Sequence, residues 1–216
     1  MSEDIKRIFL GFDIRLCRED YNMTGWDQEV FLLRVDVEWP LSIDTKVWPS
    51  AFDQLGPSEF PVNATHPSTG FWFDLETMLN FLKQPKMNHI RRGVPISVEL
   101  VMDEDLSKDT FWESVRYPYR PSSPNRKPAG WTLLGYDVAD RSQLSGLANC
   151  AYTAEEKPNL RSTWSAKLNE HGLFRSPEDA ARFKDTVDLR VREHAPFYFY
   201  ALYRNPFLWE RESVRK

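Results

Sequence analysis

Residues 130–152 read Gly-Trp-Thr-Leu-Leu-Gly-Tyr-Asp-Val-Ala-Asp-Arg-Ser-Gln-Leu-Ser-Gly-Leu-Ala-Asn-Cys-Ala-Tyr. The apolar and aromatic residues up to Val138 are typical of a buried strand. The small and polar residues after Ala139 are typical of a tight turn that includes a short helix. We therefore predict a strand over 131–138, followed by a turn that gathers most of the chemically versatile side chains of this stretch. These side chains belong to Asp137, Asp140, Arg141, Ser145, Asn149 and Cys150.

Two segments nearer the N-terminus alternate between apolar and polar residues, over 8–16 and over 31–39. In the first segment, Asp13 and Arg15 fall on the face opposite the apolar residues, which predicts a half-buried strand. Turn-forming residues lie between the two segments, so we expect them to pair as an antiparallel hairpin. Further strands are expected over 95–102 and over the aromatic run 197–203.

Three longer helices are expected between these strands. One begins after Asp74, a good N-cap residue, and ends before Pro85; a second covers 158–168. A third runs from Pro177 to about Glu193, with Ser176 as its N-cap. The pattern predicts an α+β fold with a single mixed, largely antiparallel sheet of about five to six strands and helices packed on one face.

The domain organisation that we expect is a single domain over 1–216. Residues 118–130 hold four prolines and several basic residues, so they form a candidate internal linker. The N-terminal and C-terminal parts each offer few strands, and one shared sheet is the more economical arrangement. We find no internal repeat and no low-complexity segment in the sequence.

Composition limits the classes of partner and the cellular location. The formal net charge is −4 and the calculated pI is about 5.7, which argues against a dedicated nucleic-acid-binding protein. The N-terminus lacks the pattern of a signal peptide, and no apolar run is long enough to span a membrane. With only Cys17 and Cys150 as cysteines, a disulfide framework is not expected, so we predict a cytoplasmic protein.

The turn after residue 137 contains two candidate nucleophiles, Cys150 and Ser145. A Cys150 nucleophile would need a base such as His171 or His194, which would have to come from the C-terminal half of the chain. Ser145 lacks the Gly-x-Ser-x-Gly pattern of a nucleophile turn. The simpler interpretation of Cys150 is a small buried side chain.

Metal and cofactor sites have little support in the sequence. The four histidines are scattered, no His-x-x-x-His or Cys-x-x-Cys pair occurs, and no glycine-rich phosphate loop is found. Asp137 and Asp140 could bind a hard cation, but a helix cap at Asp140 explains that residue without a ligand. We therefore expect no metal and no cofactor.

An acidic cluster after the strand over 95–102 is the densest negative patch of the chain. As a strand end and helix cap it needs no further role, and as a docking site it would face a basic partner. Its residues are Asp103, Glu104, Asp105 and Asp109.

The segment 131–152, with Gly-Tyr-Asp-Val-Ala-Asp and Leu-Ser-Gly-Leu-Ala-Asn-Cys-Ala-Tyr, resembles a segment of small bacterial immunity proteins. These proteins are encoded beside polymorphic toxins, including those of contact-dependent inhibition systems. The resemblance implies a protein that binds a cognate toxin domain and blocks it, and it implies no particular fold.

Binding and neutralising a toxin domain is therefore the leading expectation for this chain, which would then not be an enzyme. One alternative is a small hydrolase or transferase that uses the 137–150 turn with a histidine from the C-terminal half. A second alternative is a small-ligand-binding module, lined by the 197–203 strand and nearby tryptophans. The oligomeric state is left open.

Overall fold

The structure of the chain is a computed structural model. It describes residues 7–16, 40–53, 55–56, 59, 61, 63–66, 69–90, 93–101, 129–148 and 152–205. The described strands are β1 (Arg7–Arg15), β2 (Val94–Val101), β3 (Thr132–Ala139) and β4 (Tyr198–Arg204), and they form one antiparallel sheet with the order β1-β2-β4-β3. The fold is α+β, as predicted, but the described residues supply four strands instead of five to six. The strand expected over 31–39, and with it the hairpin, lies outside the described residues.

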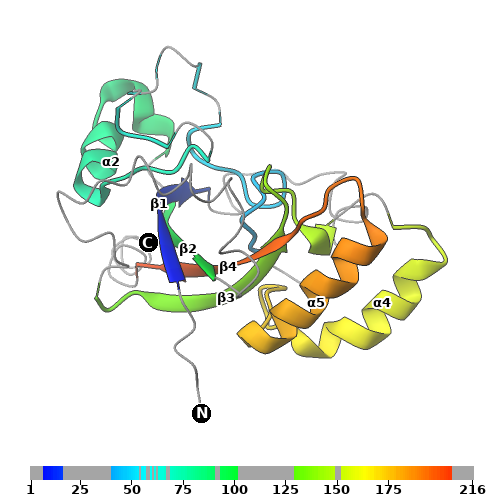
Figure 1. The fold of residues 1–216 in the computed structure, drawn as a ribbon. Coiled ribbons are helices and arrows are strands. Elements are labelled where there is room, and N and C mark those ends of the chain that lie inside the picture. Colours follow the sequence, from blue (N-terminus) through cyan, green and yellow to red (C-terminus); the bar gives the residue numbers. More distant parts are fainter. Residues whose placement is uncertain are drawn as a thin grey trace. The chain divides into compact units, whose positions relative to one another are not determined.

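The helices begin where the sequence places their caps. Helix α2 (Leu75–Leu82) follows Asp74, whose carboxylate accepts the Thr77 amide, and α5 (Pro177–Arg190) follows Ser176, whose hydroxyl accepts the Asp179 amide. Helix α4 (Glu156–Trp164) starts two residues before the expected position. Short 3-10 helices complete the described elements (Figure 1): η3 (Pro85–Ile90), η5 (Gly146–Ala148) and η6 (Ser165–Lys167). None of the helices in the described ranges is long and apolar enough to cross a membrane.

Strand β1 corrects one expectation, because both of its faces are buried. Asp13 and Arg15, assigned from the sequence to a solvent face, are 5% and 0% exposed. The Arg15 Nε atom lies 3.0 Å from the Asp13 carboxylate, and burial raises the pKa of that carboxyl above its usual value. Alternation of polar and apolar residues was misleading here because the polar residues pair with each other.

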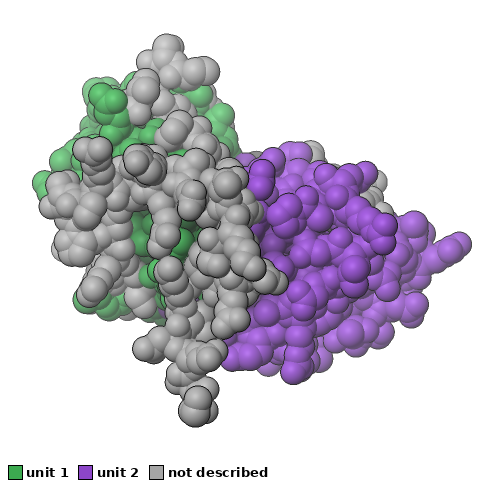
Figure 2. Space-filling model, viewed as in Figure 1, with its two compact units in different colours: residues 1–16, 50–132, 203–216 green, residues 17–49, 133–202 purple. Residues whose placement is uncertain are grey.

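The chain divides into two compact units (Figure 2). Unit 1 comprises residues 1–16, 50–132 and 203–216, and unit 2 comprises residues 17–49 and 133–202. The expected single domain stays a prediction, and most of the linker expected over 118–130 lies outside the described residues.

Unit 1 is built around β1. The last residue of the strand, Arg15, forms a β-bridge with Ser50, and Phe12 in its middle forms one with Trp72. Helix α2 follows Trp72, and β2 then pairs antiparallel with β1, with Arg7 opposite Val101 and Arg15 opposite Val94. Gly11 has a φ of +140°, and a side chain there would approach the Trp72 carbonyl oxygen to 2.5 Å.

Unit 2 repeats this order of elements around β3. The last residue of the strand, Ala139, forms a β-bridge with Ser145, and Tyr136 in its middle forms one with Phe174. Helix α5 follows Phe174, and β4 then lies beside β3 in the sheet. Gly135, directly before Tyr136, has a φ of +147°, close to that of Gly11.

The hydrogen bonds of the two units correspond as well. The Ser50 hydroxyl donates to Asp13 at 2.7 Å and accepts the Phe52 amide at 3.2 Å. In unit 2 the Ser145 hydroxyl donates to Asp137 at 2.7 Å and accepts the Leu147 amide at 3.2 Å.

The turn before each helix is also shared. Gly70 and Gly172, both left-handed with φ of +71° and +74°, stand two residues before the bridging aromatic residue and four before the N-cap. The units are thus two versions of one β–turn–α–β arrangement, and the expectation of no internal repeat was wrong. The repeated strand sequence is short: Leu10-Gly-Phe-Asp-Ile14 matches Leu134-Gly-Tyr-Asp-Val138.

Candidate functional site

The carboxyl group of Asp137 is fully buried in unit 2 and accepts four hydrogen bonds. Its Oδ1 atom accepts the Val138 amide at 2.8 Å and the Ser145 hydroxyl at 2.7 Å. Its Oδ2 atom accepts the Ile43 amide at 2.9 Å and the Ser42 hydroxyl. Burial raises the pKa of Asp137 to about 6, although all four bonds act to lower it. With its lone pairs occupied inside the unit, this carboxyl group is a structural anchor.

Residues 40–48 are the segment that Asp137 holds. Asp44 makes a second connection between this segment and the turn after β3, because its Oδ2 atom accepts the Ser145 amide at 3.0 Å. The Leu41 amide donates to the carbonyl oxygen of His171 at 3.0 Å. Sequence reasoning missed the role of Ser42 and Asp44, since they lie about a hundred positions before the turn and carry no motif.

Asp140 closes the turn that follows β3. Its Oδ1 atom accepts the Ser142 amide at 2.8 Å and the Leu144 amide at 2.9 Å. Helix η5 begins only at Gly146, so Asp140 does not cap it, and the expected cap was wrong. The hydroxyl that accepts an amide of η5 is that of Ser145, which bonds the Leu147 amide.

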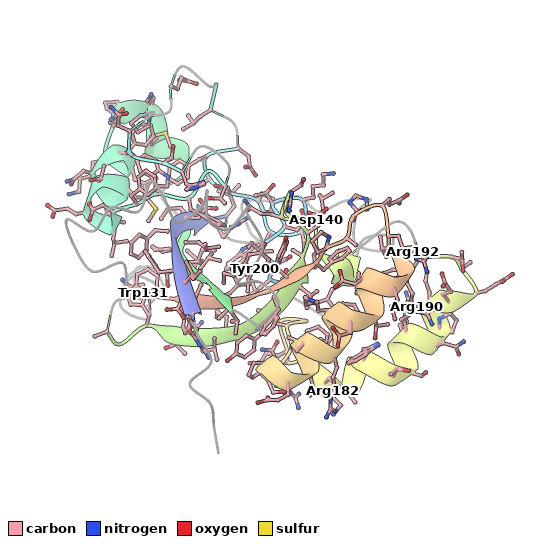
Figure 3. All side chains as sticks on the ribbon, in the orientation of Figure 1. Trp131, Asp140, Arg182, Arg190, Arg192 and Tyr200 are labelled. Carbon is pink, nitrogen blue, oxygen red and sulfur yellow. The ribbon has the colours of Figure 1, made fainter. Side chains whose placement is uncertain are left out.

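The second oxygen of Asp140 is paired with a histidine from the connection between α5 and β4. The Nδ1 atom of His194 lies 2.9 Å from Asp140 Oδ2, and the Tyr200 hydroxyl donates to the Asp140 carbonyl oxygen at 3.4 Å. The side chain of Asp140 is 6% exposed and that of His194 is 29% exposed. Figure 3 shows Asp140 at the end of β3 and Tyr200 on β4. A half-exposed imidazole that is oriented by a buried carboxylate is able to exchange protons with solvent or a ligand.

The structure places the other predicted site residues as follows. Arg141 is exposed in the turn beside Asp140. Asn149 and Cys150 lie outside the described residues, as does the acidic cluster of Asp103, Glu104, Asp105 and Asp109. Their roles stay predictions. Of the two histidines considered as bases, His194 reaches the turn.

Comparison of the two units distinguishes the site residues that both units contain from those found only in unit 2. Asp13 and Ser50 in unit 1 reproduce Asp137 and Ser145, so the fold itself requires this aspartate–serine pair. Asp140 follows β3 at the position where Leu16 follows β1. The pairing of Asp140 with His194 is therefore an addition of unit 2 that the shared architecture does not require.

A second difference concerns the other oxygen of the buried aspartate. In unit 1, Asp13 Oδ2 is paired with Arg15, whereas Ala139 stands at the equivalent position of unit 2. The Ser42 hydroxyl and the Ile43 amide take the place of that guanidinium at Asp137. In unit 2 the 40–48 segment thus supplies the partners of this carboxylate oxygen, whereas in unit 1 the Arg15 side chain alone supplies them.

Within the described ranges, no group of three or more His, Cys, Asp or Glu side chains is arranged to hold a metal ion. No protein-family model, curated protein or solved structure matches this chain significantly.

Proposed function

We propose that this chain is an immunity protein that binds a cognate toxin domain in the cytoplasm and blocks it. The likeness of residues 131–152 to such proteins is one support. The structure offers a second: the buried polar residues of this stretch, Asp137 and Ser145, hold the unit together. A fold stabilised in this way presents a rigid surface, and rigid surfaces lose little entropy on binding.

The exposed face of α5 is the observation that carries the proposal. Leu189 is 71% exposed, whereas Phe183 and Val187 on the same helix are fully buried. Arg182, Arg190 and Arg192 lie along α5 and just past its end (Figure 3). Arginine around an apolar residue is a composition enriched in the centres of protein interfaces.

Two of these arginines are available to a partner. Arg190 forms an ion pair with Glu156 at 2.7 Å. Arg182 and Arg192 are exposed, and neither makes an ion pair with another residue of the described ranges. We place the contact with the toxin domain on this face, with acidic groups of the toxin opposite the two guanidinium groups.

The test begins with the neighbouring gene. The C-terminal domain of a large secreted protein encoded directly upstream is expressed with this chain, and we expect the two to co-purify and the domain to lose its toxicity. Failure of the two proteins to bind, or an upstream gene without such a domain, contradicts the proposal.

Variants then locate the surface. Leu189→Asp should weaken binding by about tenfold or more, because interface centres tolerate charge poorly. Leu133→Asp is the matched control, since Leu133 is also an exposed leucine (40%) but belongs to β3, and this variant should leave binding unchanged. If both variants bind like the wild-type protein, the toxin uses another surface.

A further inference from the structure

The pair formed by Asp140 and His194 takes no part in the contact that we propose on α5. We propose that His194 is the proton acceptor of a hydrolytic site, positioned by Asp140, for small esters that carry a negative charge. This activity goes beyond the proposed binding function, with which it shares Arg192, and it rests on the geometry of the pair and on the comparison of the two units.

The arrangement of the pair defines which nitrogen of His194 reacts. The Nδ1 atom lies 2.9 Å from a carboxylate oxygen, so in the neutral ring this nitrogen carries the proton. The Nε2 atom then holds a lone pair, and the His194 side chain as a whole is 29% exposed. A carboxylate that fixes the tautomer and orientation of a base is the arrangement found in hydrolytic triads.

Asp140 is itself held firmly. Its Oδ1 atom accepts the amides of Ser142 and Leu144, and its carbonyl oxygen accepts the Tyr200 hydroxyl. A carboxylate with three such constraints holds the imidazole in one orientation, which lowers the cost of reaching a reactive geometry.

Comparison with unit 1 shows that the fold does not need this pair. Unit 1 makes the same strand, serine bridge and helix with Leu16 where unit 2 has Asp140. Asp140 closes its turn through Oδ1, but the pairing of Oδ2 with His194 has no counterpart in unit 1, so this pairing is the part of the site that indicates a chemical role.

The charge around His194 indicates the class of ester. Arg192 is exposed two residues before His194, and Figure 3 shows it at the C-terminal end of α5. Glu193 is also exposed, with a carboxylate oxygen 4.0 Å from His194 Nε2. The guanidinium can bind a carboxylate of the substrate.

The reaction uses water as the nucleophile. His194 Nε2 takes a proton from a water molecule as the water oxygen bonds to the ester carbonyl carbon. The bond from that carbon to the alcohol oxygen then breaks, and the imidazolium returns its proton to the alcohol. The products are a carboxylic acid and an alcohol, and no oxidant or cofactor is consumed.

Two chromogenic esters test the proposal, neutral 4-nitrophenyl acetate and anionic 4-nitrophenyl hemisuccinate. Against the purified full-length chain, His194→Gln should lower kcat/KM for both esters by about tenfold or more. His171→Gln is the matched control, because His171 is 25% exposed and its Nε2 atom lies 3.9 Å from Glu170. Equal rates for wild-type protein and His194→Gln, or an equal loss in His171→Gln, overturn the proposal.

Separate kinetic measurements test the roles of Asp140 and Arg192. Asp140→Asn should lower kcat and shift the pH profile of kcat/KM, an effect that a purely structural residue would not have; circular dichroism checks that the variant is folded. Arg192→Gln should raise KM for the hemisuccinate and leave KM for the acetate unchanged. If Arg192→Gln changes both esters equally, the assignment of an anionic substrate is wrong.

Discussion

A buried aspartate that follows a glycine and an aromatic residue organises each unit at the residue scale. Asp13 and Asp137 both accept a serine hydroxyl and the amide of the next residue. They differ in charge compensation, because only Asp13 has an arginine at its side. Asp137 relies on neutral donors, which compensate a buried charge less completely.

Asp137 should make the stability of the protein depend on pH. Its pKa is about 6 in the folded chain against the usual value of 3.8 for an aspartate, so between these values the folded state binds more protons than the unfolded state. The stabilisation from this group is complete below about pH 4 and is lost as pH rises through 6, a change of about 3 kcal/mol. Chemical denaturation of wild-type protein and Asp137→Asn at several pH values measures the difference.

The comparison isolates one carboxyl group. In Asp137→Asn the free energy of unfolding should lack this fall between pH 4 and 6, while Asp185→Asn on the exposed face of α5 should keep it. Identical pH dependence in Asp137→Asn and the wild-type protein would show that the carboxyl group ionises normally in the fold.

At the scale of elements, each unit depends on close approach between its first strand and the segment before its helix. Gly135 has a φ of +147°, and a methyl group there would lie 2.7 Å from the Leu173 side chain and 3.0 Å from the Phe174 carbonyl oxygen. Both the backbone conformation and the space therefore require glycine.

Gly135→Ala should lower the free energy of unfolding by roughly 2–4 kcal/mol, because it adds backbone strain to a steric clash. Gly70→Ala is the control, since Gly70 has a φ of +71° but nothing within 4 Å of the added methyl group. Its cost should be about 1 kcal/mol. Thermal or urea denaturation gives both values, and equal costs would mean that the contact at Gly135 relaxes freely.

The elements were largely predictable from sequence, and the interactions of the site were not. Local signals suffice for α2 and α5, whose caps at Asp74 and Ser176 lie where expected. The partners of Asp137 and Asp140 come from residues 42–43 and 194, and no local signal reports such distant contacts. The repeat is hard to recognise in the sequence because it retains one five-residue match, and because residues 16–49 separate β1 from its serine whereas only residues 140–144 separate β3 from its own.

At the scale of the whole molecule, two compact units with equivalent hydrogen bonds should respond locally to local changes. Ser42→Ala removes one hydrogen bond to Asp137, at a cost of about 1 kcal/mol. The Ile43 amide, bonded to the same oxygen, should then exchange its hydrogen about fivefold faster. Hydrogen exchange measured by NMR should show no change for the Phe12 and Trp72 amides of unit 1.

A uniform acceleration across both units would instead show that they open together. In that case Ser42 contributes to the global stability of the chain, and the 40–48 segment stabilises both units instead of unit 2 alone.

The bridges at Phe12 and Tyr136 also restrict how another chain can attach. β1 and β3 are the first and last strands of the sheet, and the middle of each already exchanges two backbone bonds, with Trp72 at 2.9 and 2.8 Å and with Phe174 at 2.9 and 2.8 Å. Exposed sheet edges invite an incoming strand and promote aggregation. Because the central backbone groups of both strands are already bonded in this way, an added strand would have to displace Trp72 or Phe174 to pair there.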